Sequence, residues 1–131
     1  MPNAIEQEIT LNASPKRIYD ALLDSGQFSE FTAAGPAEIS RDAGGVFSCF
    51  GGMITGRNIE LVPGQRIVQA WRAGNWPAGK YSIVKFELSA QGSGAILKLH
   101  QDGYPEESRE HLESGWQKMY WDPLKKYLTQ A

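Results

Sequence analysis

The sequence predicts an α+β fold in which a curved antiparallel sheet of six to seven strands wraps around a long C-terminal helix. Alternating residues at 4–11 indicate one strand, short strands between glycine-rich turns fill residues 37–102, and an apolar stripe at helical spacing runs over 106–129. An antiparallel sheet with one apolar face must be covered, and only the last helix is long enough to cover it. The 131 residues therefore suit a single domain, 1–131.

Two short helices are predicted directly after the first strand. Ser14 and Pro15 form a helix start, because the serine side chain can accept a free backbone N–H and proline suits the first turn. Gly26 is expected to end this helix, and a second short helix follows at 27–32. The chain order is therefore a strand, a helix pair, six further strands and a long helix.

The six further strands are separated by turns rich in glycine, at spacings typical of antiparallel hairpins. In the fifth of them, Val84, Phe86 and Leu88 alternate with Lys85 and Glu87, so one face is expected to be buried and the other wet. The strands are predicted at residues 37–40, 46–50, 54–61, 66–72, 81–90 and 95–102.

The C-terminal segment 106–129 is predicted to be one helix of roughly 36 Å, at about 1.5 Å per residue. Leu112, Trp116, Met119 and Tyr120 fall on one apolar stripe. Pro123 lacks the N–H that an interior helical residue donates, so a kink is expected there.

Composition and charge exclude several classes of function. Thirteen basic and fifteen acidic residues give a net charge of −2, which provides no electrostatic footprint for nucleic acid or for an anionic membrane. Cys49 is the one cysteine, which fits a reducing, cytoplasmic location and excludes an internal disulfide. With His100 and His111 as the two histidines, no metal site and no cofactor are expected.

No catalytic constellation is visible in the sequence, so the chain is predicted not to be an enzyme. Both histidines are expected at the surface, since His100 alternates with Leu99 and His111 lies early in an amphipathic helix. The sequence also lacks a nucleophile elbow, a zinc-protease motif and a phosphate loop. A cyclase- or hydrolase-like activity stays open as an alternative that would need an inward-facing acid–base pair.

The space between sheet and helix is the first candidate site. Residues that point into it form either a filled core or a cavity for a small hydrophobic ligand, with polar groups such as Gln101 fixing the ligand or bonding to neighbours. The ligand-cavity candidates are Phe47, Cys49, Ile59, Gln69, Trp71, Val84, Phe86, Leu99, Gln101, Trp116, Met119 and Tyr120.

The second candidate site is a protein-binding surface on the loop at 74–79. Trp76 and Pro77 lie in this loop and Arg72 precedes it, and exposed tryptophan and arginine are typical anchors of interfaces. Trp76 is expected either to be exposed there or to fold back as a lid over the mouth of the cavity.

Several short motifs occur in a fixed order along the chain. They are Ser14-Pro15, Gly44-Gly45-Val46-Phe47, Leu61-Val62-Pro63, the strand that ends Trp71-Arg72, Trp76-Pro77-Ala78-Gly79 and Gly115-Trp116. Their order and spacing resemble those of the START-like (SRPBCC) helix-grip superfamily. Within it, the chain is similar to the activators of heat-shock protein 90 ATPase, in particular to their C-terminal domain.

This resemblance implies a non-enzymatic role as a chaperone co-factor or stress-related binding protein, with a heat-shock protein 90-type chaperone as partner. Helix-grip relatives often hold an apolar small molecule, so binding or sensing of such a ligand is the alternative. The sequence leaves the oligomeric state open.

Overall fold

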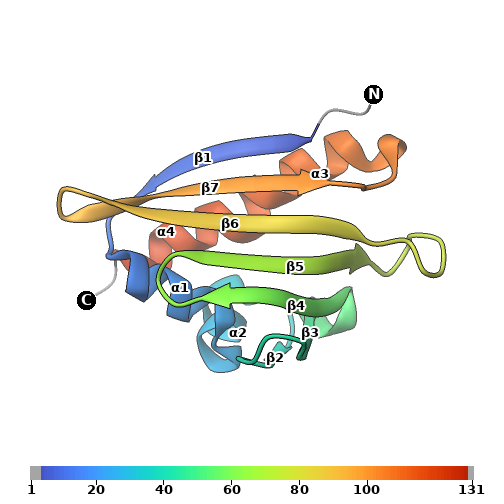
Figure 1. Cartoon of the computed structure of the whole chain (residues 1–131), viewed down its shortest axis with the longest axis horizontal. Coiled ribbons are helices and arrows are strands. Elements are labelled where there is room, and N and C mark those ends of the chain that lie inside the picture. Colours follow the sequence, from blue (N-terminus) through green and yellow to red (C-terminus); the bar gives the residue numbers. More distant parts are fainter. Residues whose placement is uncertain (1–3, 130–131) are drawn as a thin grey trace.

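The computed structural model describes residues 4–129, so the ends of the predicted 1–131 domain lie outside the described residues. One antiparallel sheet contains all seven of its strands, in the order β1-β7-β6-β5-β4-β3-β2 (Figure 1). The strands are β1 (Ile5–Leu11), β2 (Glu38–Ile39), β3 (Val46–Cys49), β4 (Ile54–Val62), β5 (Arg66–Ala73), β6 (Ser82–Gln91) and β7 (Gly94–Asp102).

The helices lie on one face of this sheet and leave the other face uncovered (Figure 1). Two short helices, α1 (Pro15–Leu23) and α2 (Ser25–Thr32), follow β1 as predicted. Ser14 Oγ accepts a hydrogen bond from the backbone N–H of Arg17 at 3.2 Å and caps α1. The predicted end at Gly26 is wrong, because Asp24 already ends α1 and caps α2, accepting from the Gln27 N–H at 2.9 Å.

A β-bulge in β4 changes which side chains face the core. The pairing with β5 shifts register between Asn58 and Glu60, so the strand places an extra residue there. Asn58 takes the inward position and is fully buried, whereas Ile59 is 50% exposed. The prediction that Ile59 lines the interior is therefore wrong, because simple alternation does not hold across a bulge.

The C-terminal helical run spans Glu106–Leu128 and crosses the sheet (Figure 1). It consists of a short 3₁₀ turn (Glu106–Ser108), α3 (Arg109–Gly115), a π-helical turn (Trp116–Trp121) and α4 (Asp122–Leu128). In the π turn the Asp122 N–H donates to the Gln117 carbonyl five residues earlier. This wider turn lies just before Pro123, which cannot donate to the carbonyl of Met119 in a regular α-helix.

The π turn also rotates the apolar stripe of the helix. Trp121, five residues after Trp116, becomes fully buried, and the two indole rings stack at 5.7 Å. Met119, predicted to face the interior, is 40% exposed instead. The prediction for Met119 is wrong because it assumed an unbroken α-helical period.

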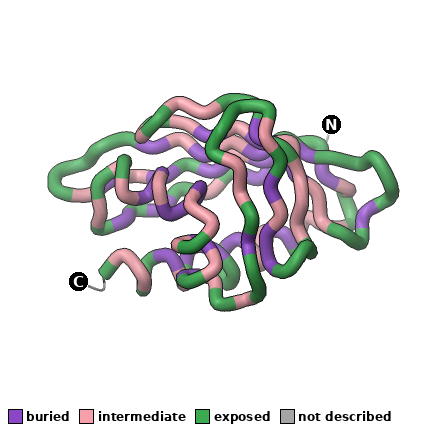
Figure 2. The backbone as a smooth tube through the Cα atoms, turned by 90° about the horizontal axis from the view of Figure 1, so that it is seen from below, coloured by how far each residue is buried: buried purple, intermediate pink, exposed green. Residues whose placement is uncertain are grey.

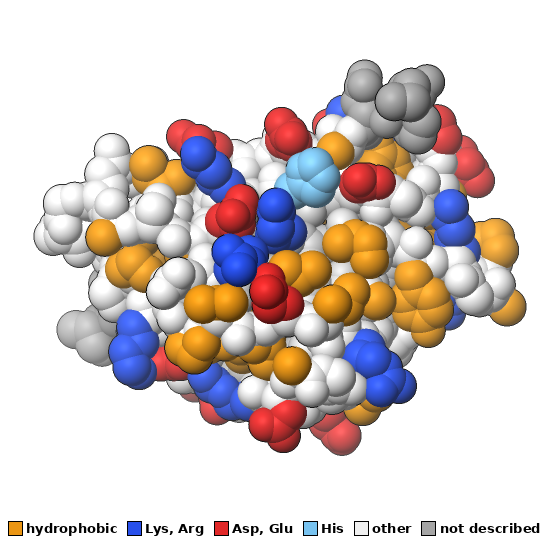
Figure 3. Space-filling view, in the orientation of Figure 1, with side chains coloured by type: hydrophobic (Ala, Val, Ile, Leu, Met, Phe, Trp, Pro, Cys, Tyr) orange, Lys and Arg blue, Asp and Glu red, His pale blue; other side chains and the backbone are white. Residues whose placement is uncertain are grey.

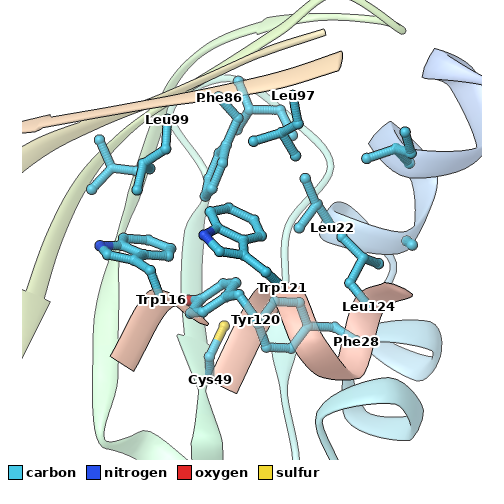
Figure 4. Packing of buried hydrophobic residues seen from close by; sticks show 14 of the residues in the cluster. Leu22, Phe28, Cys49, Phe86, Leu97, Leu99, Trp116, Tyr120, Trp121 and Leu124 are labelled. Atoms are coloured by element: carbon cyan, nitrogen blue, oxygen red, sulfur yellow. The ribbon is translucent and has the colours of Figure 1, made fainter. Parts of the chain in front are cut away.

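The core fills the space between helix and sheet. Trp116 and Trp121 point from the helix toward Phe86 and the leucines of β7, and Tyr120 packs beside Trp116 (Figure 4). Their ring centroids lie close together, with 4.4 Å between Trp116 and Tyr120 and 5.7 Å between Phe86 and Trp116. Figure 2 shows the buried positions of helices and strands facing one another, while loops carry most exposed positions.

A chain of buried hydrogen bonds joins the C-terminal helix to the sheet. Gln101, fully buried at the inward position predicted for it, accepts from Trp116 Nε1 at 2.8 Å and donates to Ser82 Oγ at 3.0 Å. Ser82 Oγ donates in turn to the backbone carbonyl of Trp71 at 2.9 Å. Buried polar groups require such partners, so these bonds fix the position of the helix on the strands.

Candidate functional site

A pocket of about 430 Å³ opens at one end of the helix–sheet interface. It lies where the C-terminal helix passes the turn after β3 and the loop after β5. Its lining is predominantly apolar and aromatic, which is typical of sites for small molecules or apolar side chains. The lining residues are Phe50, Met53, Ile54, Trp71, Ala73, Gly74, Asn75, Trp76, Ser108, His111, Leu112, Gly115, Trp116, Met119 and Tyr120.

Aromatic rings form the inner wall of this pocket. The centroid of Trp71 lies 5.4 Å from that of Trp116 and 5.7 Å from that of Trp76. On the other side Phe50 contacts Tyr120 edge to face at 5.5 Å. Phe50 adopts a positive φ of 56°, a conformation that side-chain-bearing residues rarely take, in the turn that brings its ring to this wall.

Arg72 holds the loop that carries Trp76. Its Nη2 donates to the backbone carbonyls of Trp76 at 2.7 Å and Pro77 at 3.2 Å, and its Nε donates to the carbonyl of Lys80 at 3.3 Å. Trp76 is thereby folded onto Trp71 and is only 6% exposed. The expectation of an exposed Trp76 is wrong, and its side chain lies instead at the pocket, while Pro77 is exposed and Arg72 half-buried.

The lining of this pocket contains few polar side chains. Trp71 Nε1 is buried and forms no hydrogen bond of normal geometry among the described residues. The Tyr120 hydroxyl nevertheless lies close enough to the Trp71 indole for that indole to lower the pKa of Tyr120. Burial raises the pKa of Tyr120 well above its usual value, so the phenol stays neutral. Ser108, His111 and Asn75 also line the pocket. The arrangement suits an apolar guest with at most one or two polar atoms.

Cys49 lies beneath Tyr120, inside the core and away from this pocket (Figure 4). Burial raises the pKa of its thiol to about 12. Among residues 4–129 no cation contributes to this pKa, so the side chain serves as a small apolar packing group rather than a nucleophile.

The predicted cavity residues are divided between the pocket and the packed core. Trp71, Trp116, Met119 and Tyr120 line the pocket, and Met119 does so from an exposed position. Val84, Leu99 and Gln101 are buried in the core, whereas Ile59 is exposed. The remaining predicted residues lie, together with Tyr120, around a void of only about 10 Å³. They are Phe47, Cys49, Gln69 and Phe86.

Several pocket residues are absent from the prediction. Phe50 and Met53 belong to a turn that the sequence predicts only as the end of a strand, so no periodicity marks their direction. Leu112 lies on the predicted helical stripe, which placed it against the sheet rather than beside a pocket. Trp121 is a core residue that the prediction also missed, because the π turn before Pro123 changes the helical phase.

No ion-binding cluster and no membrane-spanning segment occur in the part of the chain that the structure describes. Within residues 4–129, no group of three or more His, Cys, Asp and Glu side chains could hold a metal ion. None of the helices described there has the length and apolar character needed to cross a bilayer.

Comparison with known proteins agrees with this architecture. The crystal structure of an HSP90 activator from Plasmodium falciparum matches with a TM-score of 0.89 at 24% identity, over 97% of this chain and 96% of that chain. An open antiparallel sheet around a C-terminal helix places the protein in the helix-grip class of folds. Over residues 12–129 the sequence matches the family model described as "Activator of Hsp90 ATPase homolog 1-like protein", and the chain belongs to that family.

Curated relatives carry the same family name. The chain is 34% identical over 113 residues to the "Activator of 90 kDa heat shock protein ATPase homolog" of Dictyostelium discoideum, covering 86% of this chain and 29% of that protein. It is 29% identical over 116 residues to the human "Activator of 90 kDa heat shock protein ATPase homolog 1", covering 88% and 34%. The chain thus spans about a third of the length of these relatives.

Proposed function

We propose that this protein is a co-factor of a heat-shock protein 90-type chaperone and raises its ATPase activity by binding. The observation that carries the proposal is the family match, which extends over nearly the whole described chain. Relatives named as activators of a 90 kDa heat-shock protein ATPase support the choice of partner. The proposal retains the non-enzymatic role and the cytoplasmic location expected from the sequence.

A binding protein without catalytic groups can stimulate an ATPase by shifting a conformational equilibrium. It does so when it binds the hydrolysis-competent conformer of the chaperone more tightly than the other conformer. The change in the free-energy difference between the two conformers then equals the difference between the two binding free energies. Coupling of this kind typically amounts to 5- to 150-fold, or about 1–3 kcal/mol. The chain is then expected to bind the ATP-loaded chaperone more tightly than the nucleotide-free one.

Calorimetric titration of the protein into its host's full-length chaperone tests this proposal. In the presence of a non-hydrolysable ATP analogue we expect an affinity about tenfold higher than without nucleotide. Equal affinities would contradict the mechanism by population shift. Absence of binding under both conditions would overturn the proposed partner.

The pocket supports a second proposal, the binding of a small hydrophobic ligand. A volume of about 430 Å³ lies within the range of small-molecule sites, and its lining is mostly apolar and aromatic. The packed core beneath the helix offers no comparable space, since its void measures about 10 Å³.

The fluorescent probe 8-anilinonaphthalene-1-sulfonate tests the second proposal. We expect the native protein to bind it and the variant Gly115→Phe to lose that binding, since a Cβ at Gly115 meets no atom within 4 Å and a phenyl group there would occupy the pocket. The variant Gly115→Ala, which leaves most of the pocket empty, serves as the control. Equal probe binding by all three proteins would contradict the proposal.

A further inference from the structure

The face of the sheet opposite the helices carries an exposed apolar patch. Figure 3 shows apolar side chains gathered across this face, beside a region of Lys, Asp, Glu and His side chains. Val46, Tyr81 and Ile83 are 60%, 48% and 45% exposed. We call these three residues, together with Ala70, the outer patch.

Strand pairing places three of these residues, Val46, Ala70 and Ile83, in one row across four strands, with Arg57 between Val46 and Ala70. Val46 in β3 pairs with Arg57 in β4, Arg57 pairs with Ala70 in β5, and Ala70 pairs with Ile83 in β6. At about 4.8 Å between neighbouring strands, the row is about 14 Å long. A shallow hollow beside this row is lined by Ala70, Val46, Arg57 and Tyr81 among other residues.

Two cationic side chains at this patch lack carboxylate partners. Among the described residues, neither Arg57 nor Arg72 forms an ion pair. Arg57 Nη1 donates to the carbonyl of Gly44 at 2.9 Å, and the guanidinium of Arg72 lies 5.8 Å from the ring centre of Tyr81.

Two carboxylates elsewhere on the same face have cationic neighbours, since Glu60 lies 2.7 Å from Arg66 and Glu87 lies 3.7 Å from Lys85. Asp102 pairs with Ile83 at the β7 edge of the patch and lies 3.8 Å from the ring of His100. The outer patch is therefore an apolar strip bordered by two arginines. Arg72 already donates to the carbonyls of Trp76, Pro77 and Lys80, whereas Arg57 uses Nη1 for the Gly44 carbonyl and can donate from its other guanidinium nitrogens to an external carboxylate.

We propose that the outer patch docks a protein surface that presents a carboxylate between apolar side chains. The inference rests on the proposed function, since it takes the chaperone as the protein that carries this surface. Arginine, tyrosine and isoleucine around a shallow hollow form an anchor of the kind that dominates protein interfaces, and a bidentate arginine–carboxylate pair would fix the register.

A second copy of this chain fits the outer patch less well than an acidic partner. A two-fold symmetric contact would place the same patch on both sides and so bring four arginines, Arg57 and Arg72 of each copy, into one interface. Like charges brought together at an interface oppose association. The row of about 14 Å is also short for a standard interface, so the contact is expected to be weak and transient.

The variants Arg57→Glu and Ile83→Thr, measured by calorimetry against the host's full-length chaperone, test this inference. Arg57→Glu reverses the charge of an exposed side chain, and Ile83→Thr removes apolar contact while keeping a β-branched residue in the strand. We expect each variant to bind about tenfold more weakly than the wild type, within the range of interface anchors. Circular dichroism melting of each variant establishes that it folds.

Matched controls lie on the same face at a distance from the patch. Lys98→Glu repeats the charge reversal, and Ile96→Thr repeats the apolar change. Ile96 pairs with Ser89, which lies six residues from Ile83 along β6, about 20 Å away. Both controls are expected to bind within twofold of the wild type.

The possible results separate the two proposals. If the wild type binds and the patch variants bind equally well, the outer patch is not the docking surface, while the proposed function stands. If the wild type does not bind, the proposed function fails and this inference fails with it. If light scattering shows a dimer that Ile83→Thr dissociates, the patch is occupied by a second copy and the proposal is overturned.

Discussion

Gln101 connects the last strand to the C-terminal helix through side-chain bonds alone. Its amide accepts from Trp116 and donates to Ser82, and all three side chains are buried. Alternation along 95–102 places Gln101 inward in the sequence, and the need for a partner follows from its polarity. The identity of that partner depends on the rotation of the helix, which the sequence does not define.

The variant Gln101→Leu is expected to lower the free energy of unfolding by about 2 kcal/mol. Leucine is similar in size but leaves the Trp116 N–H buried without an acceptor, which is the costly part of the change. Urea unfolding measures the loss. In a protein that already carries Trp116→Phe, the substitution Gln101→Leu should lower the free energy of unfolding by less than it does in the wild type. If the effects of the two substitutions simply add, the hydrogen bond between Gln101 and Trp116 does not couple them.

Cys49 is expected to be unreactive in the native protein. With a thiol pKa of about 12, roughly one molecule in ten thousand carries a thiolate near pH 8. Reaction with 5,5′-dithiobis(2-nitrobenzoic acid) should therefore be slow without denaturant and rapid in concentrated guanidinium chloride. Fast stoichiometric reaction of the folded protein would show that the thiol is accessible and its pKa ordinary.

Regular elements of this fold could be predicted from the sequence because they keep a constant period. The strands β6 and β7 alternate without interruption, and their predicted and observed bounds differ by a residue or less at most ends. Irregular elements could not be predicted in the same way. The bulge at Asn58 and the π turn at Trp116–Trp121 each change the phase, and so Ile59 and Met119 face outward.

Gly56 in β4 provides a test at the level of the sheet. A Cβ at this position would lie 1.9 Å from the carbonyl oxygen of Ala70 and 2.7 Å from the ring of Phe47. The variant Gly56→Ala is therefore expected to lose about 3 kcal/mol of stability, since overpacking a sheet forces backbone and ring to move. Thermal unfolding followed by circular dichroism measures the effect.

Gly115 in α3 is the matched control for Gly56. A Cβ there meets no atom within 4 Å, and the backbone is helical. Gly115→Ala should raise the free energy of unfolding by about 0.5–1 kcal/mol, because alanine restricts the unfolded chain and favours the helix. Equal destabilisation by both substitutions would contradict the packing described for β4.

At the scale of the whole molecule, the sequence could predict a helix–sheet sandwich but not where empty space remains in it. Twelve residues predicted to line a cavity include core residues such as Val84 and Phe86, because alternation identifies inward positions without measuring how well they pack. The pocket lies at one end, where the Trp76 loop and the Phe50 turn meet the helix. The conformations of this loop and this turn determine where they contact the helix, and such segments have no periodic sequence pattern from which to predict their conformation.

The two faces of the molecule offer different binding modes. The pocket provides a concave apolar volume that opens to the surface, whereas the outer patch provides a flatter strip beside two arginines. Family membership favours a protein partner, and the outer patch gives that partner a surface with defined chemistry. The account therefore depends on whether the chaperone responds to this chain.

ATP turnover by the host's full-length heat-shock protein 90-type chaperone, titrated with the purified protein, tests this claim most directly. We expect turnover to rise with added protein and to reach a plateau about fivefold or more above the basal rate, as conformational coupling of the usual size would give. Arg57→Glu should shift the half-maximal concentration upward and leave the plateau unchanged. Turnover that stays at the basal rate at saturating protein would contradict the account.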